Sequence, residues 1–209
     1  MENFVINIGR QLGSGGRAIG HILARDLGIA YYDKEILELA AKESGFCTEV
    51  FERSDEHKTF FRSVFGNIVP FFGSGSDFYN NQLSEESLFR LQSEAICKAA
   101  EERSCIFIGR CADYVLRNHP RCVNVFVSAD PADRIDRICK ARGIDGKAAR
   151  RVMEQGDAKR AEFYNFYSPS RWGAAATYHL CINSSVLGIE QTAAFIRLFV
   201  EQKLNLTAR

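Results

Sequence analysis

The stretch VINIGRQLGSGGRAIGHILARDLGIAYYD, from Val5 to Asp33, constrains the fold of this chain more than any other. An apolar run typical of a buried strand leads into four glycines within eight residues, and a helical pattern follows them. Such a turn directs backbone N–H groups and the positive end of the helix dipole at one point, which suits a phosphate group. A turn that uses glycine only for its backbone freedom is the less favoured interpretation.

Short apolar runs alternate with longer helical patterns along the rest of the chain. This alternation predicts a three-layer α/β/α fold with a parallel sheet. Strands are expected at Val5–Ile8, Ala30–Tyr32, Cys105–Ile108, Val123–Val127 and His179–Ile182. Helices are expected at Gly16–Leu27, Lys34–Lys42, Glu85–Glu102, Ala132–Ala141, Lys147–Phe163 and Gly188–Gln202.

The length of 209 residues accommodates one α/β domain with a small appendage, but not two full domains. Two segments interrupt the alternation. Residues 53–83, rich in aromatic residues, Gly, Ser and Asn, predict a flap or a partner-binding insertion. Residues 143–175 contain a basic helix and loop before the last strand, where a closing lid is expected. Exposed aromatic residues in the flap also suggest a homodimer.

The charge and cysteine content exclude several classes of protein. The 27 Lys and Arg residues balance 26 Asp and Glu residues, so no global field favours nucleic acid or an acidic membrane. The seven cysteines form no C-x-x-C pair, which predicts buried thiols without disulfides or a zinc site. No segment reaches membrane-spanning length and no leader pattern opens the chain, so a cytoplasmic protein is expected.

Two phosphate-binding patterns compete for the glycine loop. The first is the dinucleotide fingerprint G-x-G-x-x-A, which Gly13, Gly15 and Ala18 match. Asp33 follows about 20 residues later, at the end of the second expected strand, as that fingerprint requires. This match alone predicts an NAD(P)-dependent oxidoreductase.

The second pattern is the nucleoside triphosphate loop G-x-x-x-x-G-K-[ST]. Its best register places Arg10 at the first glycine and Gly15 at the second. Gly16 then stands at the lysine and Arg17 at the hydroxyl residue, so this match alone is poor.

Arginines after the later strands favour the triphosphate loop over the dinucleotide fingerprint. They are Arg110 after the third strand, Arg134 and Arg137 after the fourth, and Arg160, which Asp157 precedes by three residues. A dinucleotide-binding domain has no need for arginines after successive strands. Phosphoryl transfer does need them, because positioned guanidinium groups stabilise the charge on the transferring oxygens.

The chain resembles the cytidylate kinase-like group of P-loop nucleoside monophosphate kinase relatives. The resemblance rests on the ordered motifs VINIGRQLGSGG, YYDKEIL, IFIGRCADYVL, DAKRAEFYNFY and CINSSVLGIEQ. It implies a five-stranded parallel sheet in the adenylate kinase-like arrangement, with an acceptor site under a flap and an arginine-bearing lid. It also implies ATP and Mg²⁺ as cofactors, and transfer of the γ-phosphoryl group to a nucleoside monophosphate, CMP or dCMP first.

The resemblance assigns roles to individual residues. The donor phosphates are expected to meet Arg10, Gly13, Ser14, Gly15, Gly16, Arg17 and Ala18. The acceptor is expected to meet Asp33 and Arg110. The catalytic set comprises Arg17, Arg134, Arg137, Asp157 and Arg160, with Asp157 orienting Arg160. The lid adds Arg150, Arg151 and Lys159.

The loop departs from true cytidylate kinases at the two positions that usually hold phosphate and metal. Arg17 is expected to supply part of the charge of the missing lysine, although a planar fork differs from a point charge. Because the usual hydroxyl ligand is also missing, Mg²⁺ is expected to be held by phosphate and water, with Asp33 contributing through water.

Three functions remain open from the sequence. The first is a kinase whose partners are a nucleotide and a small-molecule acceptor, without nucleic acid or membrane. The missing lysine supports a noncatalytic nucleotide sensor instead. The glycine fingerprint supports an NAD(P)-binding oxidoreductase.

Overall fold

The computed structural model describes residues 2–33 and 85–206, which form parts of two compact units. Met1–Asp33 and Ala99–Arg209 make up the first unit, and Lys34–Lys98 the second. The first unit contains every described strand and every residue discussed below as part of the site. The expected helix at Lys34–Lys42, the flap at 53–83 and the homodimer contact that rests on it lie outside the described residues.

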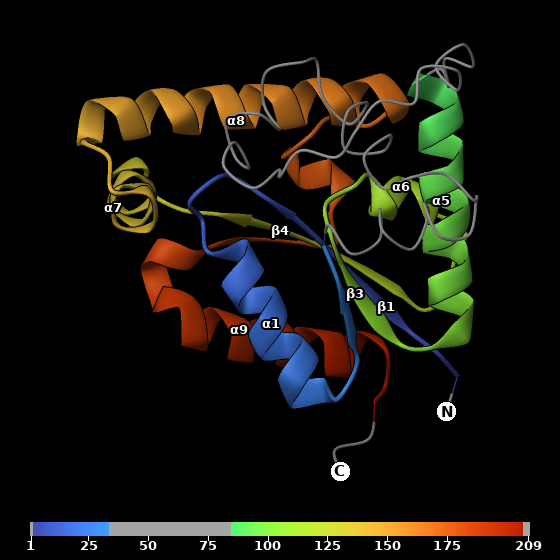
Figure 1. The fold of residues 1–209 in the computed structure, drawn as a ribbon. Coiled ribbons are helices and arrows are strands. Elements are labelled where there is room, and N and C mark those ends of the chain that lie inside the picture. The colour runs from blue at the N-terminus through green and yellow to red at the C-terminus, as the bar shows by residue number, and fades with distance from the viewer. Residues whose placement is uncertain (1, 34–84, 207–209) are drawn as a thin grey trace, which may run out of the picture. The chain divides into compact units, whose positions relative to one another are not determined.

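The sheet has five parallel strands in the order β2-β3-β1-β4-β5, so β1 is central (Figure 1). The strands are β1 Val5–Arg10, β2 Ala30–Tyr32, β3 Cys105–Ile108, β4 Cys122–Ser128 and β5 Leu180–Asn183. Ile8 of β1 pairs with Ile108 of β3 and Val125 of β4. The strands therefore end at one common edge of the sheet, where ligands of parallel sheets usually bind.

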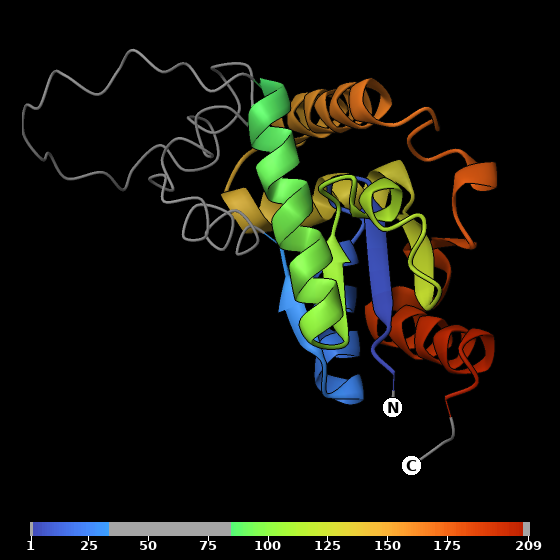
Figure 2. The ribbon, with the colours of Figure 1, turned by 90° about the vertical axis from the view of Figure 1, so that its right-hand side faces the viewer.

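The described helices are α1 Gly16–Leu27, α5 Glu85–Glu102, α6 Ala112–Val115, α7 Pro131–Arg142, α8 Gly146–Tyr167 and α9 Ser184–Lys203. Within the first unit, α1 and α9 lie together on one side of the sheet and α6 lies on the other (Figures 1 and 2). Helix α8 crosses beyond the carboxyl ends of the strands in both views. The predicted three-layer α/β/α class with a five-stranded parallel sheet is confirmed.

Two apolar clusters connect these elements. The main core packs α1 and α9 against the sheet, with Ile6, Ile8, Ile19, Ile108 and Ile196 fully buried. A smaller cluster joins α7 and α8 and includes the loop residue Leu12 at its margin. The loop after β1 is therefore packed against α7 and α8 through an apolar side chain.

The termini of α8 and α9 differ from the sequence expectation, and α8 runs to Tyr167 rather than Phe163. Helix α9 begins at Ser184 rather than Gly188, because the Asn183 side chain accepts a hydrogen bond from Ser185 N and caps it. Gly188 is non-helical, with φ 76° and ψ 173°, and separates this first turn from the rest of α9. The one-turn helix α6 was not expected at all.

Three cysteines in the described ranges, Cys105, Cys111 and Cys122, are buried as predicted, whereas Cys97 and Cys139 are half-buried and Cys181 is exposed. Burial raises the pKa of Cys105 and of Cys122 to about 12. These thiols are therefore protonated side chains of the core. Within residues 2–33 and 85–206, no helix combines the length and hydropathy that crossing a membrane requires.

Candidate active site

The loop after β1 has the backbone conformation that its glycines predict. Gly13 and Gly15 have φ values of 79° and 81°, in the left-handed region that favours glycine. A Cβ atom on Gly13 would lie 2.7 Å from the carbonyl oxygen of Arg134, and one on Gly15 would lie 2.0 Å from Cδ1 of Ile189. No larger residue fits either position without movement of the surrounding structure.

Gly13→Ala is expected to impair anion binding as well as stability, because its new methyl group meets backbone atoms of α7. Gly28→Ala is the matched control, since Gly28 also has a positive φ of 64° but has open space around its Cβ position. In both variants the alanine must adopt the left-handed backbone conformation, which destabilises the folded state by about 1–2 kcal/mol. Thermal melts with and without ATP should show ligand stabilisation in Gly28→Ala and its loss in Gly13→Ala; equal ligand stabilisation in both would contradict the expectation.

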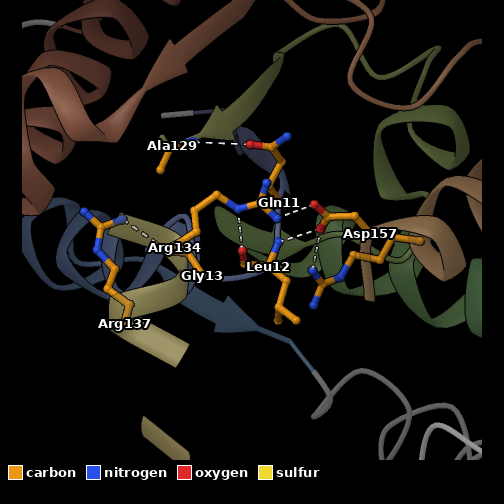
Figure 3. Close-up of polar contacts among 8 residues, drawn as sticks. Gln11, Leu12, Gly13, Ala129, Arg134, Arg137 and Asp157 are labelled. Carbon is orange, nitrogen blue, oxygen red and sulfur yellow. Dashed lines mark hydrogen bonds and ion pairs between the residues drawn. The ribbon is translucent and has the colours of Figure 1, made fainter. Parts of the chain in front are cut away.

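Side chains from α7 and α8 hold the first part of the loop in place (Figure 3). Leu12 N donates a hydrogen bond of 2.7 Å to Oδ1 of Asp157, and Arg134 Nε donates one of 2.7 Å to the Leu12 carbonyl oxygen. Arg134 also pairs with Oδ2 of Asp157. Both polar groups of the Leu12 backbone are thus bound by one buried ion pair.

The next two carbonyl groups of the loop are held from α7 and α9. Arg137 Nη1 donates to the Gly13 carbonyl oxygen at 3.1 Å and to Ser184 Oγ at 3.3 Å. Ser184 Oγ in turn donates to the Ser14 carbonyl oxygen at 2.6 Å. Three successive carbonyl oxygens of the loop are therefore bound to protein donors.

The N–H groups that follow are left for a ligand. Within the described residues, no hydrogen bond partner is present for the N–H groups of Gly15, Gly16 and Arg17. Helix α1 begins at Gly16, so its first N–H groups have no partner inside the helix either. This arrangement is typical of an anion site at a helix N-terminus.

Arg10 and Arg17 bring positive charge to this helix terminus, and Asp33 holds both. Arg17 Nε lies 2.5 Å from Oδ2 of Asp33, and Arg10 Nη2 lies 3.7 Å from Oδ1. The Arg10 side chain is only 14% exposed, whereas that of Arg17 is 60% exposed. A Cβ atom on Gly16 would lie 2.7 Å from Cβ of Arg10, so Arg10 occupies space beside the position where the triphosphate loop usually has its lysine.

Arg160 of α8 adds a further buried guanidinium group. Its Nη1 atom lies 3.6 Å from Oδ1 of Asp157, is buried, and makes no hydrogen bond within the described residues. Burial, and then repulsion by Arg10, lower the pKa of Arg160 to about 9. Burial also lowers the pKa of Arg10. Buried N–H donors of this kind need an acceptor, which a phosphate oxygen supplies.

The ion pairs described beside the loop do not cancel in charge. Among the described residues they join the four guanidinium groups of Arg10, Arg17, Arg134 and Arg160 to the two carboxylates of Asp33 and Asp157. They leave a surplus of two positive charges at a partly buried position. The cluster is therefore complementary to a multiply charged anion.

A family model described as the cytidylate kinase-like family matches residues 5–186 of this sequence. The chain belongs to this family. The predicted family resemblance is thereby confirmed. No curated protein matches the sequence.

Solved structures show the same fold. A protein described as uncharacterized, from Eubacterium ventriosum ATCC 27560, is 25% identical with a TM-score of 0.72, over 95% of this chain and 99% of its own. A shikimate kinase from Bacteroides thetaiotaomicron is 14% identical with a TM-score of 0.54, over 97% and 99%. A gluconokinase from Sinorhizobium meliloti 1021 is 11% identical with a TM-score of 0.50, over 99% and 98%. The fold is that of the P-loop kinases.

The strand order bears on the dinucleotide alternative. In the dinucleotide-binding fold β2 neighbours β1, and the acidic residue at its end reaches the ribose beside the glycine turn. Here β3 lies between β1 and β2, so that order is absent from the described sheet. Asp33 instead contacts Arg10 and Arg17. The match of Gly13, Gly15 and Ala18 to the dinucleotide pattern therefore reflects the needs of a tight loop.

Several predicted site residues have contacts other than those expected. Arg134 and Arg137 were expected to close over the phosphates, but their described hydrogen bonds hold loop carbonyl groups. Asp157 was expected to orient Arg160; it lies near that residue but also binds Arg134 and Leu12 N.

The remaining predicted residues lie at the same edge or on α8. Arg110 follows β3 in a left-handed conformation, with φ 61°, immediately after Gly109, against which the Arg10 guanidinium group lies. Arg150 and Arg151 are exposed in the first turns of α8, and Lys159 is half-buried further along it. Their assignment to the acceptor site and the lid remains a prediction.

Two residues of the loop's support were missed in the sequence. Gln11 accepts a hydrogen bond from Ala129 N through Oε1 at 3.3 Å, which ties the loop to the end of β4 (Figure 3). Ser184 binds the Ser14 carbonyl group and follows β5 directly. A small polar residue at the carboxyl end of a parallel strand was the available signal for Ser184.

The described residues do not form a ready magnesium site. P-loop kinases hold Mg²⁺ with the loop Ser or Thr and a carboxylate. Arg17 stands at the hydroxyl position and pairs with Asp33, the nearest candidate carboxylate. Asp157 is occupied by Leu12 N and two arginines. No group of three His, Cys, Asp or Glu residues placed to bind a metal exists in the described ranges.

Proposed function

We propose that this protein is a phosphotransferase that moves the γ-phosphoryl group of ATP to a small acceptor, with CMP or dCMP as the first candidates. The observation that carries the proposal is the loop itself. Its carbonyl groups are bound by α7 and α9, its following N–H groups have no described partner, and a surplus of guanidinium charge surrounds it. Membership of the cytidylate kinase-like family supports the choice of acceptor.

The proposed donor site uses the loop and the arginines around it. The N–H groups of Gly15 to Arg17 bind the β-phosphate, and Arg10 supplies the charge of the missing lysine. Arg160 donates to the transferring group, where negative charge spreads over the equatorial oxygens. Such transfer needs positioning and charge stabilisation more than covalent chemistry, so a rigid loop and fixed guanidinium groups suffice for the protein's part.

The proposed acceptor site lies at the same edge of the sheet. In this proposal Asp33, which follows β2, and Arg110, which lies beyond the end of β3, meet a hydroxyl or phosphate group of the acceptor. In this arrangement Asp33 also fixes Arg10 and Arg17, so the donor and acceptor positions share one carboxylate.

A transfer assay tests the proposed function directly. Purified protein is incubated with ATP and each of CMP, dCMP, UMP, AMP and GMP, with and without Mg²⁺, and ADP formation is measured. Shikimate and gluconate are included because neighbours of the same fold are described as shikimate kinase and gluconokinase. The proposal expects ADP formation to depend on one acceptor of the panel, with CMP or dCMP highest.

The alternative of a nucleotide sensor has one observation in its favour. Gly16 stands where a P-loop kinase has lysine, and a side chain there would meet Cβ of Arg10 at 2.7 Å. A sensor binds ATP but forms no ADP with any acceptor. Saturable ATP binding without acceptor-dependent ADP formation would therefore favour the sensor over the kinase.

Arg10, rather than Arg17, is expected to contribute most of the lysine's charge. Its side chain is mostly buried beside Gly16, whereas Arg17 is 60% exposed. Arg10→Ala should weaken ATP binding by about 1.5–3 kcal/mol, the range for a charged hydrogen bond, and Arg17→Ala by less. Isothermal titration of both variants checks this. A larger loss of ATP affinity in Arg17→Ala would show that Arg17, as the sequence first indicated, replaces the charge of the lysine.

A further inference from the structure

The loop position that usually carries a magnesium-binding hydroxyl group is occupied here by a positively charged side chain, that of Arg17. Arg17 occupies the place where the triphosphate loop has the Ser or Thr that binds Mg²⁺. We propose that this protein binds nucleoside triphosphate as the metal-free anion, with Arg17, positioned by Asp33, in place of the magnesium ion. The inference rests on the proposed nucleotide site and goes beyond it, because it changes the chemical form of the donor that the site accepts.

The contacts of Asp33 are the first support. Its Oδ2 atom is 2.5 Å from Arg17 Nε, and its Oδ1 atom is 3.7 Å from Arg10 Nη2. A magnesium ion bound here, directly or through water, would have to compete with two guanidinium groups for one carboxylate. Mg²⁺ also demands near-ideal octahedral geometry, which a carboxylate fixed by an ion pair at 2.5 Å does not easily supply.

The net charge of the cluster is the second support. Among the described residues, the four guanidinium groups and two carboxylates that form ion pairs beside the loop leave two surplus positive charges. A divalent cation added to this cluster would be repelled by it. Free ATP carries two more negative charges than its magnesium complex, so it complements the cluster better.

The position of Arg17 in α1 is the third support. Arg17 is the second residue of the helix, and the first turn contains no acidic residue. A cation at a helix N-terminus is unfavourable, because the aligned peptide dipoles place partial positive charge there. A bound anion removes this penalty, and the 60% exposed side chain of Arg17 can reach a ligand without opening the core.

Titration of ATP in EDTA and in excess Mg²⁺ tests the inference by binding alone. The wild-type protein is expected to bind ATP in EDTA at least as tightly as in Mg²⁺. Arg17→Ser supplies a hydroxyl at this position and removes the Arg17 ion pair from Oδ2 of Asp33. Mg²⁺ should now tighten binding, by roughly tenfold or about 1.4 kcal/mol. Arg25→Ser is the matched control, since Arg25 lies on the same helix, is 71% exposed and pairs with Asp26; it should retain the wild-type response.

Each possible result of these titrations either supports or overturns the inference that ATP binds without magnesium. Tighter binding by the wild-type protein in Mg²⁺ than in EDTA overturns the inference but leaves the proposed kinase intact. An equal response to Mg²⁺ in wild type and Arg17→Ser also overturns it, because Arg17 would then play no part in metal exclusion. Absence of ATP binding in both buffers removes the nucleotide site, and the inference with it. Circular dichroism melts confirm that each variant is folded.

Discussion

Asp157→Ala is expected to lower the free energy of unfolding by about 3–5 kcal/mol, the range for removing one partner of a buried ion pair. The Arg134 side chain is only 6% exposed, and Asp157 is the carboxylate that pairs with it. The variant leaves that guanidinium charge buried and uncompensated. It also removes the acceptor of Leu12 N, so the loop loses a hydrogen bond of 2.7 Å. Urea unfolding followed by circular dichroism measures the effect.

Asp136→Ala provides the comparison for Asp157→Ala. Asp136 forms an ion pair with Lys140 on α7, but its side chain is 57% exposed. Exposed pairs of this kind contribute about 0–1 kcal/mol, so this variant should remain close to wild type. If both variants lost the same small amount of stability, the Arg134–Asp157 pair would not be the support of the loop that its contacts indicate.

Arg160→Met is expected to lower turnover without lowering the free energy of unfolding. The buried Nη1 atom of Arg160 lacks a described hydrogen bond partner, and burial and Arg10 disfavour its charge. Replacing it with an apolar side chain should leave the free energy of unfolding unchanged or raise it, as buried charges often cost stability. Turnover should nevertheless fall by about 10²–10³, as when one donor to a transition-state oxygen is removed.

Arg142→Met controls for the loss of an arginine as such. Arg142 is exposed at the end of α7, away from the loop's contacts. Activity with the acceptor found in the transfer assay should be unaffected by this change. If Arg160→Met destabilised the protein strongly and left turnover unchanged, Arg160 would be a structural residue of α8 and not part of the transfer site.

The strands and helices of the core were predictable because their signals are local. Ala30–Tyr32 and Cys105–Ile108 are strands at the expected residues, and α1 runs from Gly16 to Leu27 as predicted. Each is an apolar run or helical pattern bounded by glycine or polar residues. Gly188 is the boundary that the sequence indicated, because its backbone is non-helical there. The sequence missed only the short turn that Asn183 caps before it.

The residues of the candidate site were predictable from the sequence, but their hydrogen bond partners were not. The sequence indicated Arg134 and Arg137 because arginines after parallel strands meet at one edge. It indicated Asp157 and Arg160 by their three-residue spacing on the basic helix. It did not show that Arg134 and Arg137 bind loop carbonyl groups, because a guanidinium group binds a carbonyl oxygen as readily as a phosphate. Only the three-dimensional positions distinguish the two partners.

The anchoring of the loop also sets when it can form during synthesis of the chain. The hydrogen bonds that fix residues 12–14 come from residues 122 to 170 positions further along the chain. Such distant contacts are slow to form, since long segments must be ordered first. A ribosome-bound chain that has exposed only β1 and α1 thus has the glycines but not the anchors. Ligand binding at this loop is consequently a property of the finished domain, and a ligand that protects the folded state gives no help to the emerging N-terminal segment.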